Sequence, residues 1–201
     1  MIYKENESFK RFVAVTFSTS VASDLSFYLL QEYNIILELQ DPYDFLSTTN
    51  YKDCNFINLV TQDFKLREQI SKKLSENFLP RFTFIHKSSV TDSLTIGLGC
   101  FIYPMTVCYP GSSIGQDCII HSFSLIAHKS FIGKGCILSV GVKIAGSVKI
   151  GNFSNFGLDV TVYDKVTIPD YCYIGARCIV RKNINRSGRY GFGQKNQLIE
   201  L

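Results

Sequence analysis

The hydrophobic positions of the chain follow two patterns, and the longer one occupies residues 84–185. There an apolar side chain returns at every sixth residue, and a small or β-branched residue recurs four positions after most of these. An α-helix repeats every 3.6 residues and a β-strand every two, so neither produces this spacing. The apolar series is Phe84, Val90, Ile96, Ile102, Cys108, Ile114, Ile120, Ile126, Ile132, Leu138, Ile144, Ile150, Phe156, Val162, Ile168, Ile174 and Val180.

A six-residue repeat predicts a parallel β-helix, in which each unit supplies one short strand and one turn. Three units make a coil of about 18 residues, which cannot bury its apolar edge alone, so the coils must stack. About six coils at the usual strand spacing of roughly 4.8 Å form a rod nearly 30 Å tall. We expect the first and fifth residues of each unit to point inward, and residues 18 apart to lie above one another.

The first 80 residues predict a small α/β domain instead. Buried strands are expected at residues 12–17, 35–39 and 56–60, helices at residues 21–31 and 63–77, and a turn at residues 41–44. Arg67 is expected on the solvated face of the second helix, together with its lysines. The alternation of strands and helices favours a parallel sheet. We therefore divide the chain into a Rossmann-like α/β domain (1–80), a β-helix (81–185) and a polar, glycine-rich C-terminal tail (186–201).

Composition narrows the class of protein. At 201 residues with 46% hydrophobic content, the chain is long enough for a small domain plus a solenoid. A formal net charge of +4 gives no argument for a nucleic-acid partner, and no apolar run approaches the roughly 18 residues needed to span a membrane. Residues 1–7 lack the basic-then-apolar order of a secretory signal. We expect a cytoplasmic protein that binds neither nucleic acid nor membrane.

The seven cysteines are spaced as structural residues. A free cysteine behaves as a small, buried apolar residue, and the chain contains no CxxC pair of the kind that binds zinc. Most of them fall at the small inward position of the repeat and form one column with a serine. The column consists of Cys100, Cys118, Cys136, Ser154 and Cys172, while Cys178 takes the same place in another unit and Cys108 an apolar one.

His128 is the candidate catalytic residue. It takes the third place of its unit, so its side chain is predicted to face outward, and Gly146 lies 18 residues further on in the same column. A missing side chain lets a ligand approach the backbone, and a neutral imidazole near pH 7 can take a proton from an attacking amine or hydroxyl. Asp164, two coils away at about 9.6 Å, is too distant to orient the ring. An ordinary surface or turn-capping role is the alternative.

Several segments resemble the hexapeptide-repeat sugar acetyltransferases of bacteria. They are SLIAHKSFIG (124–133), SVGVKIAGSVKIG (139–151), IGARCIVRKN (174–183) and the lead-in IHKS (85–88). The group includes sialic acid O-acetyltransferases and N-acetyltransferases of nucleotide-linked 4-amino-4,6-dideoxy sugars, and the resemblance covers most of the chain. It implies a left-handed parallel β-helix. That handedness breaks the usual right-handed crossover rule, so the periodicity alone does not give it.

The resemblance also implies a site. His128 would be the general base, with acetyl-CoA as co-substrate in a groove between neighbouring subunits of a homotrimer and no metal. Backbone groups of Gly146, Leu158, Gly175 and Ala176 would line the groove, and the domain at 1–80 would lie on the acceptor side. Basic residues near the C-terminus suit the phosphates of coenzyme A, although a solvated charged surface explains them nearly as well. They are Lys165, Arg177, Arg181, Lys182, Arg186, Arg189 and Lys195.

The chain departs from that family around His128. Relatives usually have an acidic neighbour there, whereas here Ala127 and Lys129 flank the histidine. The base is therefore weaker unless the fold brings another carboxylate to it. Where relatives commonly carry an acceptor-contacting asparagine, this chain has His121, which suggests a changed acceptor. Residues 191–195 keep the first glycine and the lysine of a Gly-x-Pro-Ala-Lys ending but lose its proline.

The turn after the first strand departs further. Relatives place a glycine-rich turn with a histidine there, whose amides cradle a nucleotide or sugar. Ser18, Thr19 and Ser20 occupy this turn here. Their hydroxyls can bind an anion of the acceptor or cap the following helix.

Three functions are compatible with these features. The leading one is an acyl-CoA-dependent transferase that acetylates an amino or hydroxyl group of a free or nucleotide-linked sugar in surface-polysaccharide or glycan biosynthesis. The alternative is a catalytically reduced hexapeptide-repeat module for sugar binding or assembly. A zinc hydrolase of the carbonic anhydrase type needs three outward histidines, and the spacing of His86, His121 and His128 does not match.

Overall fold

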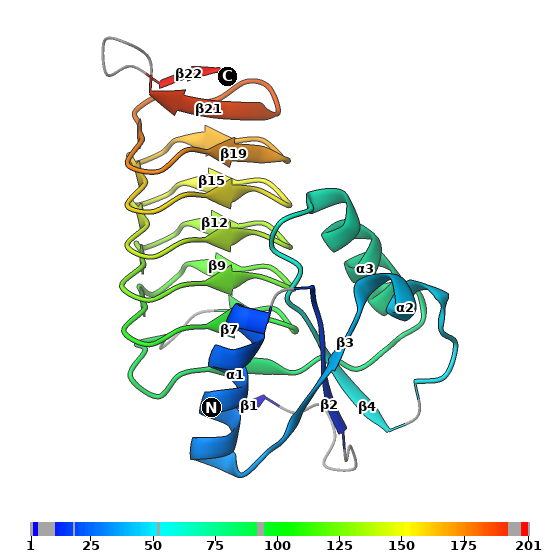
Figure 1. The fold of residues 1–201 in the computed structure, drawn as a ribbon. Coiled ribbons are helices and arrows are strands. Elements are labelled where there is room, and N and C mark those ends of the chain that lie inside the picture. The colour runs from blue at the N-terminus through cyan, green and yellow to red at the C-terminus, as the bar shows by residue number, and fades with distance from the viewer. Residues whose placement is uncertain are drawn as a thin grey trace. The chain divides into compact units, whose positions relative to one another are not determined.

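The computed structural model describes residues 2–3, 11–17, 19–51, 53–91, 95–192 and 198–200. The chain divides into two compact units, Ile2–Phe84 and Ile85 onward. Helices belong to the first unit and stacked coils of short strands to the second (Figure 1). The prediction of an α/β unit followed by a parallel β-helix is confirmed. In the part of the chain that the structure describes, none of the helices has the length and apolar character of a membrane span.

The α/β unit is built on a three-stranded parallel sheet in the order β3-β2-β4. Its buried core includes Val13, Val15, Phe45, Phe56 and Ile70. A short antiparallel pair, β1 with β5, belongs to the same part of the chain. The elements are β1 (Ile2–Tyr3), β2 (Arg11–Val15), α1 (Thr19–Tyr33), β3 (Leu37–Gln40), α2 (Pro42–Ser47), β4 (Cys54–Asn58), α3 (Phe64–Glu76) and β5 (Thr83–Ile85).

A short helix, α2, begins inside the segment expected to form a turn. The Asp41 carboxylate accepts hydrogen bonds from the backbone N–H groups of Tyr43 (2.8 Å) and Asp44 (3.3 Å). Pro42 occupies the first turn, where its missing N–H costs nothing. Asp-Pro signals a turn and a helix start equally well, and the burial of Phe45 favours the helix.

The prediction that Arg67 is solvated is wrong. Its side chain is fully buried, and Nη1 donates to the backbone oxygens of Asn58 (3.0 Å) and Val60 (2.7 Å). The Asn58 amide in turn donates to the Arg67 carbonyl at 2.8 Å. These carbonyls lie at and just beyond the end of β4, and a cation inside the unit satisfies them. The charge pattern along α3 does not indicate that these carbonyl groups need a buried hydrogen-bond donor.

The β-helix has about six turns and three parallel sheets. Their orders are β7-β10-β13-β16-β19-β21, β8-β11-β14-β17-β20 and β6-β9-β12-β15-β18, which we name the β7, β8 and β6 sheets. Paired residues lie 18 apart, as in Ile126 with Ile144. The strands are β6 (Thr95–Ile96), β7 (Phe101–Ile102), β8 (Val107–Cys108), β9 (Ser113–Ile114), β10 (Ile119–Ile120), β11 (Leu125–Ile126), β12 (Phe131–Ile132), β13 (Ile137–Leu138), β14 (Lys143–Ile144), β15 (Lys149–Ile150), β16 (Asn155–Phe156), β17 (Thr161–Val162), β18 (Thr167–Ile168), β19 (Cys172–Ile174) and β20 (Ile179–Val180).

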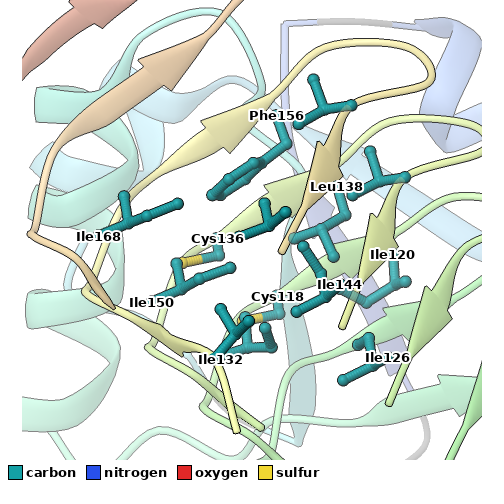
Figure 2. Packing of buried hydrophobic residues seen from close by; sticks show 14 of the residues in the cluster. Cys118, Ile120, Ile126, Ile132, Cys136, Leu138, Ile144, Ile150, Phe156 and Ile168 are labelled. Atoms are coloured by element: carbon teal, nitrogen blue, oxygen red, sulfur yellow. The ribbon is translucent and has the colours of Figure 1, made fainter. Parts of the chain in front are cut away.

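The inward residues of the repeat form one continuous core (Figure 2). Each fully buried isoleucine contributes about 1.5–3 kcal/mol relative to an exposed one. The cysteine column lies in this core, and its thiols hydrogen-bond from one coil to the next. Sγ of Cys100, Cys118 and Cys136 donates to the carbonyl oxygens of Gly115, Gly133 and Gly151, each at 3.1 Å. The hydroxyl of Ser154 does the same toward Pro169 at 3.2 Å.

The turns between the strands share one backbone conformation. Every sixth residue from Gly99 to Arg177 has a positive φ, and most of these residues are not glycine. Phe123 (φ 61°) and Tyr171 (φ 57°) are among them. The turns form three corners. In one coil, the first corner (residues 121–124) joins the β7 and β8 sheets, the second (127–130) joins the β8 and β6 sheets, and the third (133–136) returns to the β7 sheet.

Two strands occur in the segment expected to be a tail. β21 (Gly188–Phe192) pairs in parallel with β19 and extends the β7 sheet by one strand. β22 (Leu198–Glu200) then pairs with β21 in antiparallel orientation. The last coil is therefore followed by paired backbone, which protects the exposed edge of the sheet.

Candidate functional site

His128 lies at the second corner, directly after β11. Its neighbours in the repeat, Ile126 and Ser130, point inward and are fully or almost fully buried. The Ser130 hydroxyl donates to the Ala145 carbonyl at 2.7 Å and accepts from the Val148 N–H at 3.2 Å. These bonds tie the turn to the next coil. His128 itself is exposed, as its place in the repeat predicts.

The His128 imidazole lies against the backbone of Gly146. A Cβ atom built on Gly146 would be 2.7 Å from Cε1 and 2.8 Å from Nε2 of the ring. The Ser147 N–H donates to the His128 carbonyl at 2.9 Å, so the two turns are also joined through the backbone. We expected the missing side chain of Gly146 to leave a gap for a ligand. The imidazole fills that gap.

In the part of the chain that the structure describes, no carboxylate is hydrogen-bonded to His128. Among the described residues, the imidazole makes no hydrogen bond. Asp164, next in the column after Gly146, lies 4.0 Å from the Lys165 ammonium, in a solvent-exposed ion pair. The described residues therefore supply no substitute for the acidic neighbour that is missing from the sequence beside His128.

The residues expected to contact acetyl-CoA fall at two different corners. Gly146 and Arg181 share the second corner with His128, and the Arg181 guanidinium lies 5.6 Å from the ring centroid of Tyr163. The first corner carries Leu158, Gly175 and Ala176. The β8 sheet separates the two corners within one chain. Lys195 lies outside the described residues.

Of these three first-corner residues, two are exposed and two have a backbone group in a hydrogen bond. Leu158 and Ala176 face solvent. The Gly175 N–H donates to the Tyr190 carbonyl at 2.7 Å, and its own carbonyl accepts from the Cys178 N–H at 3.3 Å. The Leu158 carbonyl is engaged as well, because it accepts from the Arg177 N–H at 2.7 Å. Leu158 and Ala176 therefore differ from Gly175 in the exposure of their side chains.

His121 lies at the first corner and is half-buried. Its ring stacks on Tyr103 with centroids 4.4 Å apart, and Tyr103 stacks on Phe101 at 4.1 Å. Sequence reasoning missed Tyr103. The signal was available, because Tyr103 precedes His121 by 18 residues and so lies directly beneath it.

The structure describes only some of the hydroxyl residues Ser18, Thr19 and Ser20 in the turn after β2. α1 begins at Thr19, two residues earlier than expected, and Ser20 is exposed in its first turn. Ser18 lies outside the described residues. Across the parts of the chain that the structure describes, no three His, Cys, Asp or Glu side chains form a group able to hold a metal ion.

Comparison with known proteins identifies similar folds. No protein-family model matches the chain. The acetyltransferase domain of PglB from Neisseria gonorrhoeae, in complex with acetyl coenzyme A, is 18% identical over 95% of this chain and 99% of that one, with a TM-score of 0.77. A variant of GDP-perosamine N-acetyltransferase from Caulobacter crescentus, in complex with CoA and GDP-perosamine, is 18% identical over 90% and 93%, with a TM-score of 0.72.

WeeI from Acinetobacter baumannii is also similar, with 15% identity over 94% of this chain and 100% of that one and a TM-score of 0.76. The chain shares the fold of these proteins over nearly its whole length. Two of the three are named as acetyltransferases, and their structures hold acetyl coenzyme A or CoA.

Proposed function

We propose that the chain is an acyl-CoA-dependent transferase that uses acetyl-CoA to acetylate an amino or hydroxyl group of a sugar, in surface-polysaccharide or glycan biosynthesis. One observation carries the proposal. An exposed histidine, His128, is held against a glycine backbone on a fold shared with acetyltransferase structures that hold acetyl coenzyme A or CoA. The acceptor would be a free or nucleotide-linked sugar, because the similar Caulobacter enzyme binds GDP-perosamine.

His128 would act as the general base. The acceptor amine or hydroxyl attacks the thioester carbonyl while the neutral imidazole accepts its proton. Backbone N–H groups stabilise the oxyanion of the tetrahedral intermediate. The intermediate then collapses, the C–S bond breaks, and the thiolate of coenzyme A takes the proton back from the imidazolium. Holding both substrates in one groove supplies much of the rate enhancement.

A homotrimer would complete the site. The second corner of one subunit, with His128, Gly146 and Arg181, would meet the first corner of its neighbour, with Leu158 and Ala176. Side chains at the first corner support this arrangement, because they form an exposed apolar set that a second copy would cover. They are Met105, Phe123, Val140 and Leu158.

The remaining candidates have supporting roles in this proposal. Arg181 and Lys195 would attract the phosphates of coenzyme A. His121, at the same corner as Leu158, would contact the acceptor. The hydroxyls of Ser18, Thr19 and Ser20 would bind an anionic group of the acceptor.

The test is release of coenzyme A from acetyl-CoA, measured for the wild type and for His128→Ala against a panel of free and nucleotide-linked amino sugars and sialic acids. We expect one acceptor to support turnover, and the variant to lose about a hundredfold or more, as for removal of a general base. Asp164→Ala, an exposed change in the same column, is the matched control and should retain turnover.

One observation favours a second candidate, a sugar-binding or assembly module without catalysis. The His128 imidazole makes no hydrogen bond to a carboxylate in the described part of the chain. If neither protein releases coenzyme A with any acceptor while both bind one of the sugars, this second function replaces the first.

A further inference from the structure

We infer that Gly146 is a positioning residue, whose missing side chain determines where the His128 imidazole lies. The inference rests on the proposed role of His128 as the base. In that proposal Gly146 contributes only its backbone to the acetyl-CoA groove. The structure gives this glycine a second task, which is to leave room for the ring.

The contact is specific to the imidazole. The three atoms nearest to a Cβ on Gly146 are Cε1 (2.7 Å), Nε2 (2.8 Å) and Nδ1 (3.4 Å) of His128. The Nε2–Cε1 edge of the ring therefore occupies the volume that any other residue would fill with its first carbon. A methyl group at this position would require the ring to retreat by several tenths of an ångström.

Gly133 and Gly115 are required to be glycine for a different reason. A Cβ on Gly133 would lie 2.6 Å from the backbone carbonyl of Gly151, and a Cβ on Gly115 would lie 2.6 Å from the backbone nitrogen of Lys134. Those residues permit close stacking of the coils, and replacing them must move backbone. At Gly146 the obstacle is the free end of one side chain.

The backbone of Gly146 also accepts a side chain. Its φ angle lies outside the left-handed region, so alanine is not strained there. The fold should therefore tolerate Gly146→Ala, while the imidazole must rotate or tilt away from its present place. A displacement near 1 Å at a catalytic group can cost about a hundredfold in rate.

The first test is the NMR signal of the histidine rings in the full-length protein. The chain has three histidines, and His128→Ala assigns the signal of interest. We expect Gly146→Ala to shift the His128 Cε1–H resonance and leave those of His86 and His121 in place. Asp164→Ala should shift none of them. An unchanged His128 signal in Gly146→Ala would overturn the inference.

The second test is a kinetic double-mutant cycle with the acceptor found above. If Gly146 acts through His128, Gly146→Ala should lower kcat by roughly tenfold or more in the wild type and have little further effect in His128→Ala. The KM for acetyl-CoA should change by less than about twofold, because the backbone that lines the groove is kept. Equal losses in both backgrounds, or a raised KM with an unchanged kcat, would show that Gly146 contacts the co-substrate instead.

Stability measurements keep the two proposals separate. Gly133→Ala should lower the melting temperature clearly, and Gly146→Ala should not. A matching loss of stability in Gly146→Ala would count against the inference. If His128→Ala retains full turnover, the proposed function of His128 fails, while the NMR shift still reports on the contact between the two residues.

Discussion

The imidazole of His121 stacks on the phenol ring of Tyr103, with centroids 4.4 Å apart and an angle of 26° between the ring planes. Tyr103 is held in turn by Phe101, whose ring is completely buried. The stack fixes the plane of the imidazole at the first corner. In the proposed trimer this corner faces the acetyl-CoA groove, so the stack would present a rigid imidazole to the acceptor.

We therefore predict energetic coupling between Tyr103 and His121. A double-mutant cycle with Tyr103→Leu and His121→Ala, followed by urea unfolding, should give a coupling energy of about 0.5–1.5 kcal/mol, the range for aromatic pairs. Tyr103→Phe keeps the ring and should preserve the coupling. With the acceptor in hand, Tyr103→Leu should raise the acceptor KM more than it lowers kcat. A coupling energy near zero would mean that the two rings are only neighbours.

Arg67 should be essential for the stability of the α/β unit. Arg67→Ala removes both donors from the carbonyls of Asn58 and Val60 and leaves a cavity, so we expect the free energy of unfolding to fall by roughly 2–4 kcal/mol. The measurement is denaturant unfolding followed by circular dichroism. Lys65→Ala, at an exposed position of the same helix, should change stability by less than about 0.5 kcal/mol. Similar effects of the two changes would contradict the structural role of Arg67.

The buried cysteines should be unreactive in the folded protein. Burial raises the pKa of the Cys108 thiol to about 12 and holds the pKa of the Cys100 thiol well above its usual value. The reactive thiolate is therefore scarce at pH 8, and access is blocked as well. A thiol reagent such as DTNB should find none of the seven cysteines in the native state and all seven after unfolding. Val90→Cys, at an exposed position, should react at once and calibrate the assay.

A repeat pattern predicts which residues stack on one another, but it does not predict the rotamers of their side chains. The six-residue spacing predicted the coils and their inward residues, because only a stacked β-helix buries every sixth side chain. It also placed His128 next to Gly146 in one column. It did not show that the imidazole fills the space beside the glycine. The 18-residue spacing predicts which residues are neighbours, but it does not predict the rotamer of a side chain. The positive φ angles at the corners were hidden too, because residues such as Phe123 and Tyr171 occupy them in place of glycine.

The α/β unit was predicted less completely, for a different reason. Its strands and helices followed from local hydrophobic runs, but the burial of Arg67 depends on carbonyl groups contributed by another element. The local sequence of α3 therefore gives no indication that Arg67 is buried. From sequence alone, Asp41 could either cap a helix or begin a turn. In the structure it caps α2, and the burial of Phe45 favours this helix.

A site shared between subunits predicts that two inactive variants restore activity together. His128→Ala disables the second corner, and Ala176→Glu places a charged, bulky side chain at the first. In trimers assembled from an equal mixture, about a quarter of the interfaces would combine an intact second corner with an intact first corner. We expect about a quarter of wild-type coenzyme A release after co-expression, with the trimer mass verified by light scattering. The double variant mixed with His128→Ala is the control, because none of its interfaces has an intact second corner. Trimers of the expected mass without recovered activity would show that each subunit carries a complete site.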